Sequence, residues 1–291
     1  MKYIKSFFLV FISLSLMFMV SMICLLSHIP HFLNNQTYHD VLEQVDAYAR
    51  VHETIENSLE DMMLVSNIDR HTLSNLITVD EVKQIMTQDV DAMLSWLTES
   101  GPAIEVLDLT TYETRFDKKI DTFFRNNHYE LDDADKQEIQ LMKQTAMRII
   151  QGNLRVLEFD QLTNSATWTI LPKLMKFLDI KAFIIGLMGG VVLLMAILLI
   201  IFRKKLVEGL LWSGYGILAG GLFIFILFFS GLQSGFYHHT AIQVIYLRQS
   251  IGLLIETTFK SLVICGLIAS GIGVIFMIPY WHRLYKKRLA R

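Results

Sequence analysis

The residues best suited to chemistry are two adjacent histidines, His238 and His239, which directly follow a long uncharged stretch. An imidazole can bind a metal ion or transfer a proton near neutral pH. Adjacent side chains point in different directions on a helix, so a metal site would need further ligands. His28 and His31, three residues apart at the end of another apolar stretch, could supply them. Unless these segments meet, the histidines are ordinary residues of a membrane interface, and we expect no metal and no cofactor.

Glu256 and Arg248 form a second group of polar residues near an apolar segment. Glu256 precedes Lys260 by four residues and follows Arg248 by eight. A Glu–Lys pair at this spacing is ordinary surface support for a helix, worth about 0.2–0.5 kcal/mol. The alternative is a role for Glu256 in gating or in binding a substrate. The chain contains no G-x-S-x-G, P-loop, G-x-G-x-x-G or H-E-x-x-H motif, and we assign no catalytic residue.

Apolar helices must position these residues. The chain has 291 residues, of which 53% are hydrophobic, and its mean hydropathy is +0.41. Because the apolar residues are also clumped, the sequence indicates an integral membrane protein. A helix needs about 20 apolar residues to cross a bilayer. We expect transmembrane helices at 6–27, 182–202, 209–237 and 261–281, with a polar-to-mixed connection at 238–260.

Small residues indicate how these helices pack. Segment 209–237 holds seven of the sixteen glycines. Small residues at i and i+4 let helix backbones come close in lipid. The predicted packing pairs are Gly186 with Gly190, Gly216 with Gly220, and Gly266 with Ser270. The first helix has no glycine, so we expect a tight cluster of the last three helices, with 209–237 in its middle and the first helix as a looser tether. Cys24 and Cys265 lie in apolar stretches and are interpreted as packing residues.

Residues 28–180 predict a helical bundle inserted between the first two transmembrane helices. This region carries 26 Asp and Glu against 13 Lys and Arg, a net of 13 negative charges. Apolar spacing predicts one helix over 38–63. Capping boxes at Thr78 with Glu81 and at Thr110 with Glu113 predict two more helix starts. Asp132 and Asp133 predict the start of a fourth helix. The expected fold class is therefore an all-α polytopic membrane protein.

Charge predicts the orientation of the chain. Residues 2–5, 203–205 and 282–291 carry ten basic residues, and near them lies the single acid Glu208. The positive-inside rule places such segments in the cytoplasm. We therefore expect a multi-pass protein of the cell membrane with both termini cytoplasmic and 28–180 outside. The domains are the anchor 1–27, the acidic helical domain 28–180, and a three-helix domain 181–291 that ends in a basic cytoplasmic tail.

Three functions fit this organisation. In the first, the outer helical domain binds or scaffolds a partner, as a subunit of a membrane complex. That partner is another membrane or extracytoplasmic protein, or a second copy of the chain, and we expect no nucleic acid. In the second, the chain is a channel or transporter subunit whose acidic outer residues concentrate cations. In the third, it is an outer-leaflet enzyme that uses His238 or His239 with Glu256.

Overall fold

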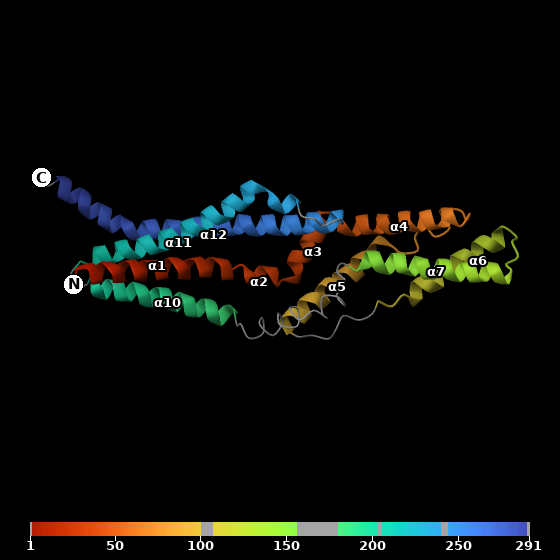
Figure 1. The fold of residues 1–291 in the computed structure, drawn as a ribbon, viewed down its shortest axis with the longest axis horizontal. Helices are drawn as coiled ribbons and strands as arrows, with labels where there is room; N and C mark the ends of the chain where they lie inside the picture. The colour runs from red at the N-terminus through yellow and green to blue at the C-terminus, as the bar shows by residue number, and fades with distance from the viewer. Residues whose placement is uncertain (1, 100–106, 156–179, 203–204, 240–243, 290–291) are drawn as a thin grey trace. The chain divides into compact units, whose positions relative to one another are not determined.

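The computed structural model of the chain describes residues 2–99, 107–155, 180–202, 205–239 and 244–289 (Figure 1). Within these ranges all regular secondary structure is helical, without a strand, which confirms the predicted all-α class. The chain divides into two compact units. We call Met1–Asn34, Leu178–Gln243 and Ile251–Arg291 the apolar unit, and Asn35–Phe177 with Val244–Ser250 the polar unit.

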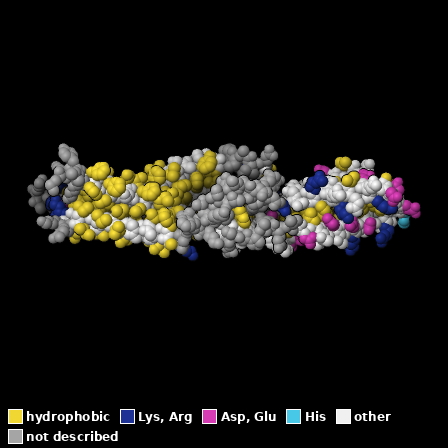
Figure 2. Space-filling model, turned by 60° about the horizontal axis from the view of Figure 1, so that its bottom comes forward, with side chains coloured by type: hydrophobic (Ala, Val, Ile, Leu, Met, Phe, Trp, Pro, Cys, Tyr) yellow, Lys and Arg dark blue, Asp and Glu magenta, His cyan; other side chains and the backbone are white. Residues whose placement is uncertain are grey.

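The apolar unit contains four helices that are long and apolar enough to cross a membrane, as the sequence predicts. They are α1 (Lys2–Leu26) continued by the short α2 (Ile29–Phe32), α10 (Ile180–Ile201), α11 (Leu206–Ser234) and α12 (Ile245–Leu289). Many large hydrophobic side chains on them are exposed, and Figure 2 shows such side chains covering this part of the molecule. Exposed apolar surface of this extent is typical of a membrane or protein contact.

The fourth apolar helix differs from the prediction. The sequence predicts a helix at 261–281 after a mixed connection, whereas α12 begins at Ile245 and runs through Pro279 to Leu289. The first six residues of α12 belong to the polar unit and the rest to the apolar unit. Polar residues such as Arg248 and Glu256 end an apolar run but do not end a helix, since Arg and Glu are good helix formers. By contrast, α10 and α11 lie within three residues of their predicted bounds.

One face of α11 lies against α1. A Cβ placed on Gly216 would be 2.9 Å from the Ser13 carbonyl oxygen, and one on Gly220 would be 2.7 Å from the Met17 carbonyl oxygen. The two backbones therefore touch where no larger residue would fit. The expectation that the first helix is a loose tether is wrong, because α1 packs closely along α11 and also contacts α10.

A different face of α11 lies against α12. A Cβ on Gly221 would be 2.5 Å from the Ser270 amide nitrogen, and one on Gly214 would be 2.8 Å from the Gly273 carbonyl oxygen. In the same contact, a Cβ on Gly266 would be 2.7 Å from the Phe225 amide nitrogen. Gly214 and Gly221 are seven residues apart, so a search for pairs at i and i+4 does not find them.

The glycines of α10 are less involved in packing. A Cβ on Gly190 would meet only the flexible Met19 side chain of α1, at 3.1 Å, and one on Gly186 would have nothing within 4 Å. The contact of α10 with its neighbours instead uses large side chains. Leu198 of α10 and Phe202, which directly follows that helix, are buried with Leu9, Ile12 and Leu16 of α1.

The polar unit is a helical bundle with one hydrophobic core. Its helices are α3 (Asn35–Gln44), α4 (Ala47–Val65), α5 (Val79–Glu99), α6 (Thr110–Asn126) and α7 (Asp133–Leu154). Each of the four longer helices turns an apolar stripe inward. The fully buried residues include Ile55, Leu59, Met63, Val82, Met86, Phe116, Ile120 and Ile150.

Three of the four predicted helix starts of the polar unit match the structure, at α5, α6 and α7, and two of the three predicted caps form. The box at Thr78 is confirmed, because the Thr78 amide donates to Glu81 Oε2 at 2.9 Å and the Glu81 amide to Thr78 Oγ1 at 3.3 Å. Asp132 caps α7 as predicted. The third helix, α6, begins at Thr110 as predicted, but the Thr110–Glu113 capping box is wrong: the Thr110 amide instead donates to Asp108 Oδ1 at 2.9 Å. The single helix predicted over 38–63 is also interrupted, at Asp46, where φ is +53°.

Glycine packing in the apolar unit gives a matched pair of substitutions. Gly221→Ala should destabilise the unit by about 1–3 kcal/mol, because the added methyl group meets backbone atoms that cannot move aside. Gly186→Ala adds the same methyl group into open space, and alanine favours a helix by about 0.5–1 kcal/mol. Unfolding of the full chain in mixed micelles of mild detergent and dodecyl sulfate measures both. Equal effects of the two substitutions would contradict this packing.

Candidate functional site

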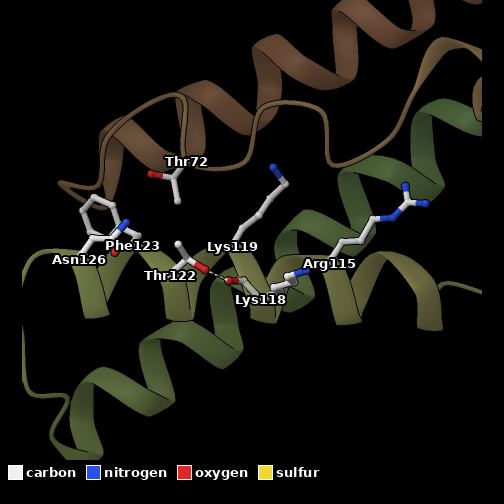
Figure 3. A pocket seen from close by; sticks show the side chains of 7 residues that line it. All are labelled: Thr72, Arg115, Lys118, Lys119, Thr122, Phe123 and Asn126. Carbon is white, nitrogen blue, oxygen red and sulfur yellow. Dashed lines mark hydrogen bonds between the residues drawn. The ribbon is translucent and has the colours of Figure 1, made fainter.

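The polar unit contains a pocket on one face of α6, with a volume of about 530 Å³. We call it the α6 pocket, and Figure 3 shows the side chains that line it. They are Thr72, Arg115, Lys118, Lys119, Thr122, Phe123 and Asn126. Except for Thr72, which follows α4, all of them come from α6, and most recur at three- or four-residue steps, which places them on one helix face.

Packing fixes the orientation of α6. Phe116 and Ile120 are fully buried in the core of the polar unit. On a further face, Asp117 pairs with Lys143 of α7, with Nζ 2.9 Å from each carboxylate oxygen. The core contact and the Asp117–Lys143 pair thus hold two faces of α6. The face that carries Lys118 and Lys119 remains to line the pocket.

Arg115 joins α6 to the start of α5. Its guanidinium donates to Glu81 Oε1 at 2.7 Å and to Glu81 Oε2 at 2.9 Å, and it also reaches the Leu76 carbonyl at 3.2 Å. Hydrogen bonds from Arg115, and then from Thr78, lower the pKa of Glu81 from its ordinary value of 4.5 to about 2, against the opposing effect of burial. Glu81 thus caps α5 and holds α6 at the same time, and its charge balances that of Arg115.

The two lysines of the pocket have no such balance. Lys119 Nζ donates to the Ser74 carbonyl at 2.8 Å, which orients the ammonium without neutralising it. In the part of the chain that the structure describes, no carboxylate pairs with Lys118 or Lys119. The pocket is therefore positively charged, although the region 28–180 as a whole has 13 more acidic than basic residues. Two ammonium groups beside the Phe123 ring can bind an anion such as a carboxylate or phosphate.

The candidate residues from the sequence lie elsewhere. His238 is exposed, with its ring centroid 4.3 Å from that of Tyr237, and the side chain of His239 lies outside the described residues. Glu256 pairs with Lys260 at 2.6 Å, as the i, i+4 spacing predicts. Arg248 belongs to the polar unit and is half-buried. Across the described ranges, no hydrogen bond or ion pair joins His238 to Glu256.

The first pair of histidines is engaged in other contacts. His28 Nε2 lies 2.8 Å from Ser261 Oγ of α12, and His28 Nδ1 lies 2.8 Å from the Cys24 carbonyl oxygen. His31 also has a polar or ring contact of its own. The residues that the structure describes contain no group of three or more His, Cys, Asp or Glu side chains that could hold a metal ion.

Two features of the molecule have no signal in the sequence. The α6 pocket needs Thr72 and the segment around Ser74 to meet α6, and Ser74 lies 45 residues before Lys119 in the chain. Cys24 and Cys265, interpreted from the sequence as packing residues, pack together in one cluster. Comparison of the chain with protein-family models, with curated proteins and with solved structures finds no match.

The pairing of Glu81 with Arg115 predicts a pH dependence. A carboxyl group whose folded pKa is lowered adds stability fully above its ordinary pKa of 4.5, and loses it as the pH falls through about 2. Arg115→Gln should therefore destabilise the polar unit by about 1–2 kcal/mol at pH 7. The difference between the variant and the original chain should shrink as the pH falls from 4.5 towards 2.

Hydrogen exchange of the α5 amides in the full chain, compared at matched pH, measures this difference. Lys136→Gln is the control, because the Lys136–Asp133 pair is exposed and such pairs contribute about 0–1 kcal/mol. A constant difference between Arg115→Gln and the original chain from pH 5 to pH 2 would show that the charge of Glu81 is not involved.

Proposed function

We propose that the chain is a multi-pass protein of the cell membrane whose domain 28–180 lies outside the cytoplasm and binds a partner protein. The partner inserts one or two carboxylates into the α6 pocket, and the two proteins form a membrane complex. The observation that carries this proposal is the pair Lys118 and Lys119, which line a pocket of about 530 Å³ without a described carboxylate partner.

Electrostatics narrows the choice of partner. The domain that carries the pocket, 28–180, has 13 more acidic than basic residues, so it would repel a long acidic segment. A surface that is neutral or basic around one or two carboxylates fits both the pocket and its surroundings. If the partner bound in any other position, its carboxylates would face acidic residues of this domain instead of the two lysines. This repulsion gives the contact its specificity.

Charge asymmetry along the chain supports the orientation. Three segments, 2–5, 203–205 and 282–291, carry ten basic residues, and each adjoins an apolar helix at the end that would face the cytoplasm. Positions 28–180 then lie outside, where a partner from that compartment can reach Lys118.

Labelling tests the orientation. Asp121→Cys and Lys287→Cys introduce thiols into α6 and into the end of α12, and the original chain gives the background of its own two cysteines. In intact cells, a membrane-impermeant maleimide should label the first variant, and should label the second only after the cells are permeabilised. The reverse pattern would contradict the proposed topology.

Photo-crosslinking tests the binding site. A photoreactive amino acid at Asn126, which lines the pocket, should crosslink the full chain in its native membrane to a peptide that carries Asp or Glu. Lys118→Glu should lower this crosslink at least tenfold, because the charge facing the carboxylate is reversed. Lys136→Glu makes the same charge change outside the pocket and should leave the crosslink unchanged.

Charge reversal in the partner completes the test. Replacing the crosslinked Asp or Glu by Lys should restore crosslinking to the Lys118→Glu variant. A crosslink to lipid or to a second copy of this chain would contradict the proposed partner. So would an equal effect of the Lys118→Glu and Lys136→Glu variants.

A further inference from the structure

The only two cysteines of the chain, 241 positions apart, meet inside the apolar unit. Cys24 of α1 is 3% exposed and packs with Ile224 of α11 and Leu262 of α12. Cys265 of α12 is half-buried and packs against this cluster. Both thiols are free, and the two cysteine side chains pack together in this one cluster. Their meeting depends on α1 and α12 both lying against α11.

Two polar residues, Ser27 and His28, lie near this thiol pair. His28 Nε2 lies 2.8 Å from the hydroxyl of Ser261, which is one turn before Cys265 on α12. Ser27 and His28 directly follow the last turn of α1, and the Ser27 hydroxyl donates to the Cys24 carbonyl at 2.9 Å. A hydroxyl and an imidazole thus both contact the backbone of Cys24.

Hydrogen bonding assigns the tautomer of His28. A carbonyl oxygen can only accept, so Nδ1, at 2.8 Å from the Cys24 carbonyl, carries the proton. Nε2 then has the lone pair, and it faces the Ser261 hydroxyl at 2.8 Å. Ser261 lies one turn before Cys265 on the same face of α12. The basic nitrogen of His28 is thus directed at the helix face that carries the more accessible thiol.

We propose that Cys24 and Cys265 are a redox-active pair that closes into a disulfide between α1 and α12, with a small or protein-borne disulfide as the oxidant. Cys265 passes its proton to His28, and its thiolate attacks the oxidant. A bond forms between Cys265 and one sulfur of the oxidant, the oxidant's own S–S bond breaks, and the other half leaves as a thiolate that takes the proton from His28.

Cys24 completes the exchange. It loses its proton to His28 and attacks Cys265 Sγ, so the Cys24–Cys265 bond forms and the mixed disulfide breaks. The second half of the oxidant leaves as a thiol with that proton. Two cysteine thiols are oxidised in total, and one external disulfide is reduced to two thiols. The product links the two helices that contact α11 on separate faces.

Thiol trapping tests this proposal on the full chain in mild detergent. The chain is incubated with oxidised glutathione, its free thiols are blocked with N-ethylmaleimide, and the sample is then reduced and treated with a polyethylene-glycol maleimide. The expected result is two added polymers per chain, and a peptide pair linked through Cys24 and Cys265 in the unreduced digest. Chains that were reduced before blocking should gain none.

Variants separate this mechanism from accidental oxidation. Cys24→Ser should leave only a mixed disulfide on Cys265, and thus one added polymer. His28→Gln should slow closure about tenfold, because the proton acceptor is lost. His31→Gln, three residues further along, should close at the original rate. Failure to form the linked peptide while both thiols remain open to alkylation would overturn the proposal. Disulfides that join two chains, or equal rates for the two histidine variants, would also overturn it.

Discussion

The apolar unit depends on the close approach of α11 to two other helices at the same time. In lipid, helices gain little from hiding apolar surface from one another, so contact between backbones must supply much of the attraction. Gly216 and Gly220 allow this contact with α1, and Gly214 and Gly221 allow it with α12. The other features of the unit follow from this arrangement, because only helices held on separate faces of α11 bring Cys24 to Cys265.

The sequence predicts the parts of this fold that depend on local properties. Apolar length gives the four long helices, and the hydrogen-bonding side chains of Thr78 with Glu81 and of Asp132 give two helix starts. It does not predict which helix packs on which, since α1 has no glycine of its own and fits into the space that the α11 glycines leave. Nor does it predict the start of α12, because polarity marks the membrane boundary rather than a helix end.

Prediction of the candidate sites from the sequence is limited in the same way, because they depend on tertiary contacts. The sequence shows Lys118 and Lys119 as two adjacent basic residues on a predicted helix. Only the tertiary structure shows that no described carboxylate pairs with them. Arg115, which has the same charge and lies on the same helix face, is neutralised by Glu81 from another helix. The sequence cannot distinguish these two situations, because each depends on which side chain the fold brings within about 3 Å. His238 and Glu256 fail as a pair for the converse reason: His238 follows the end of α11, Glu256 lies inside α12, and the fold does not join them.

The two units therefore respond to different chemical conditions. The contacts of α11 with α1 and α12 are made by backbone atoms and small residues, which neither salt nor pH changes, and the proposed redox pair of thiols lies in the same unit. The polar unit joins its helices partly through ion pairs such as Glu81 with Arg115, which acid weakens. Salt would also weaken an anion contact at Lys118, since exposed charges are screened within about 10 Å at 0.1 M salt. Under the two proposals, a change in redox conditions would act on the helices of the apolar unit, whereas ionic strength would act on partner binding.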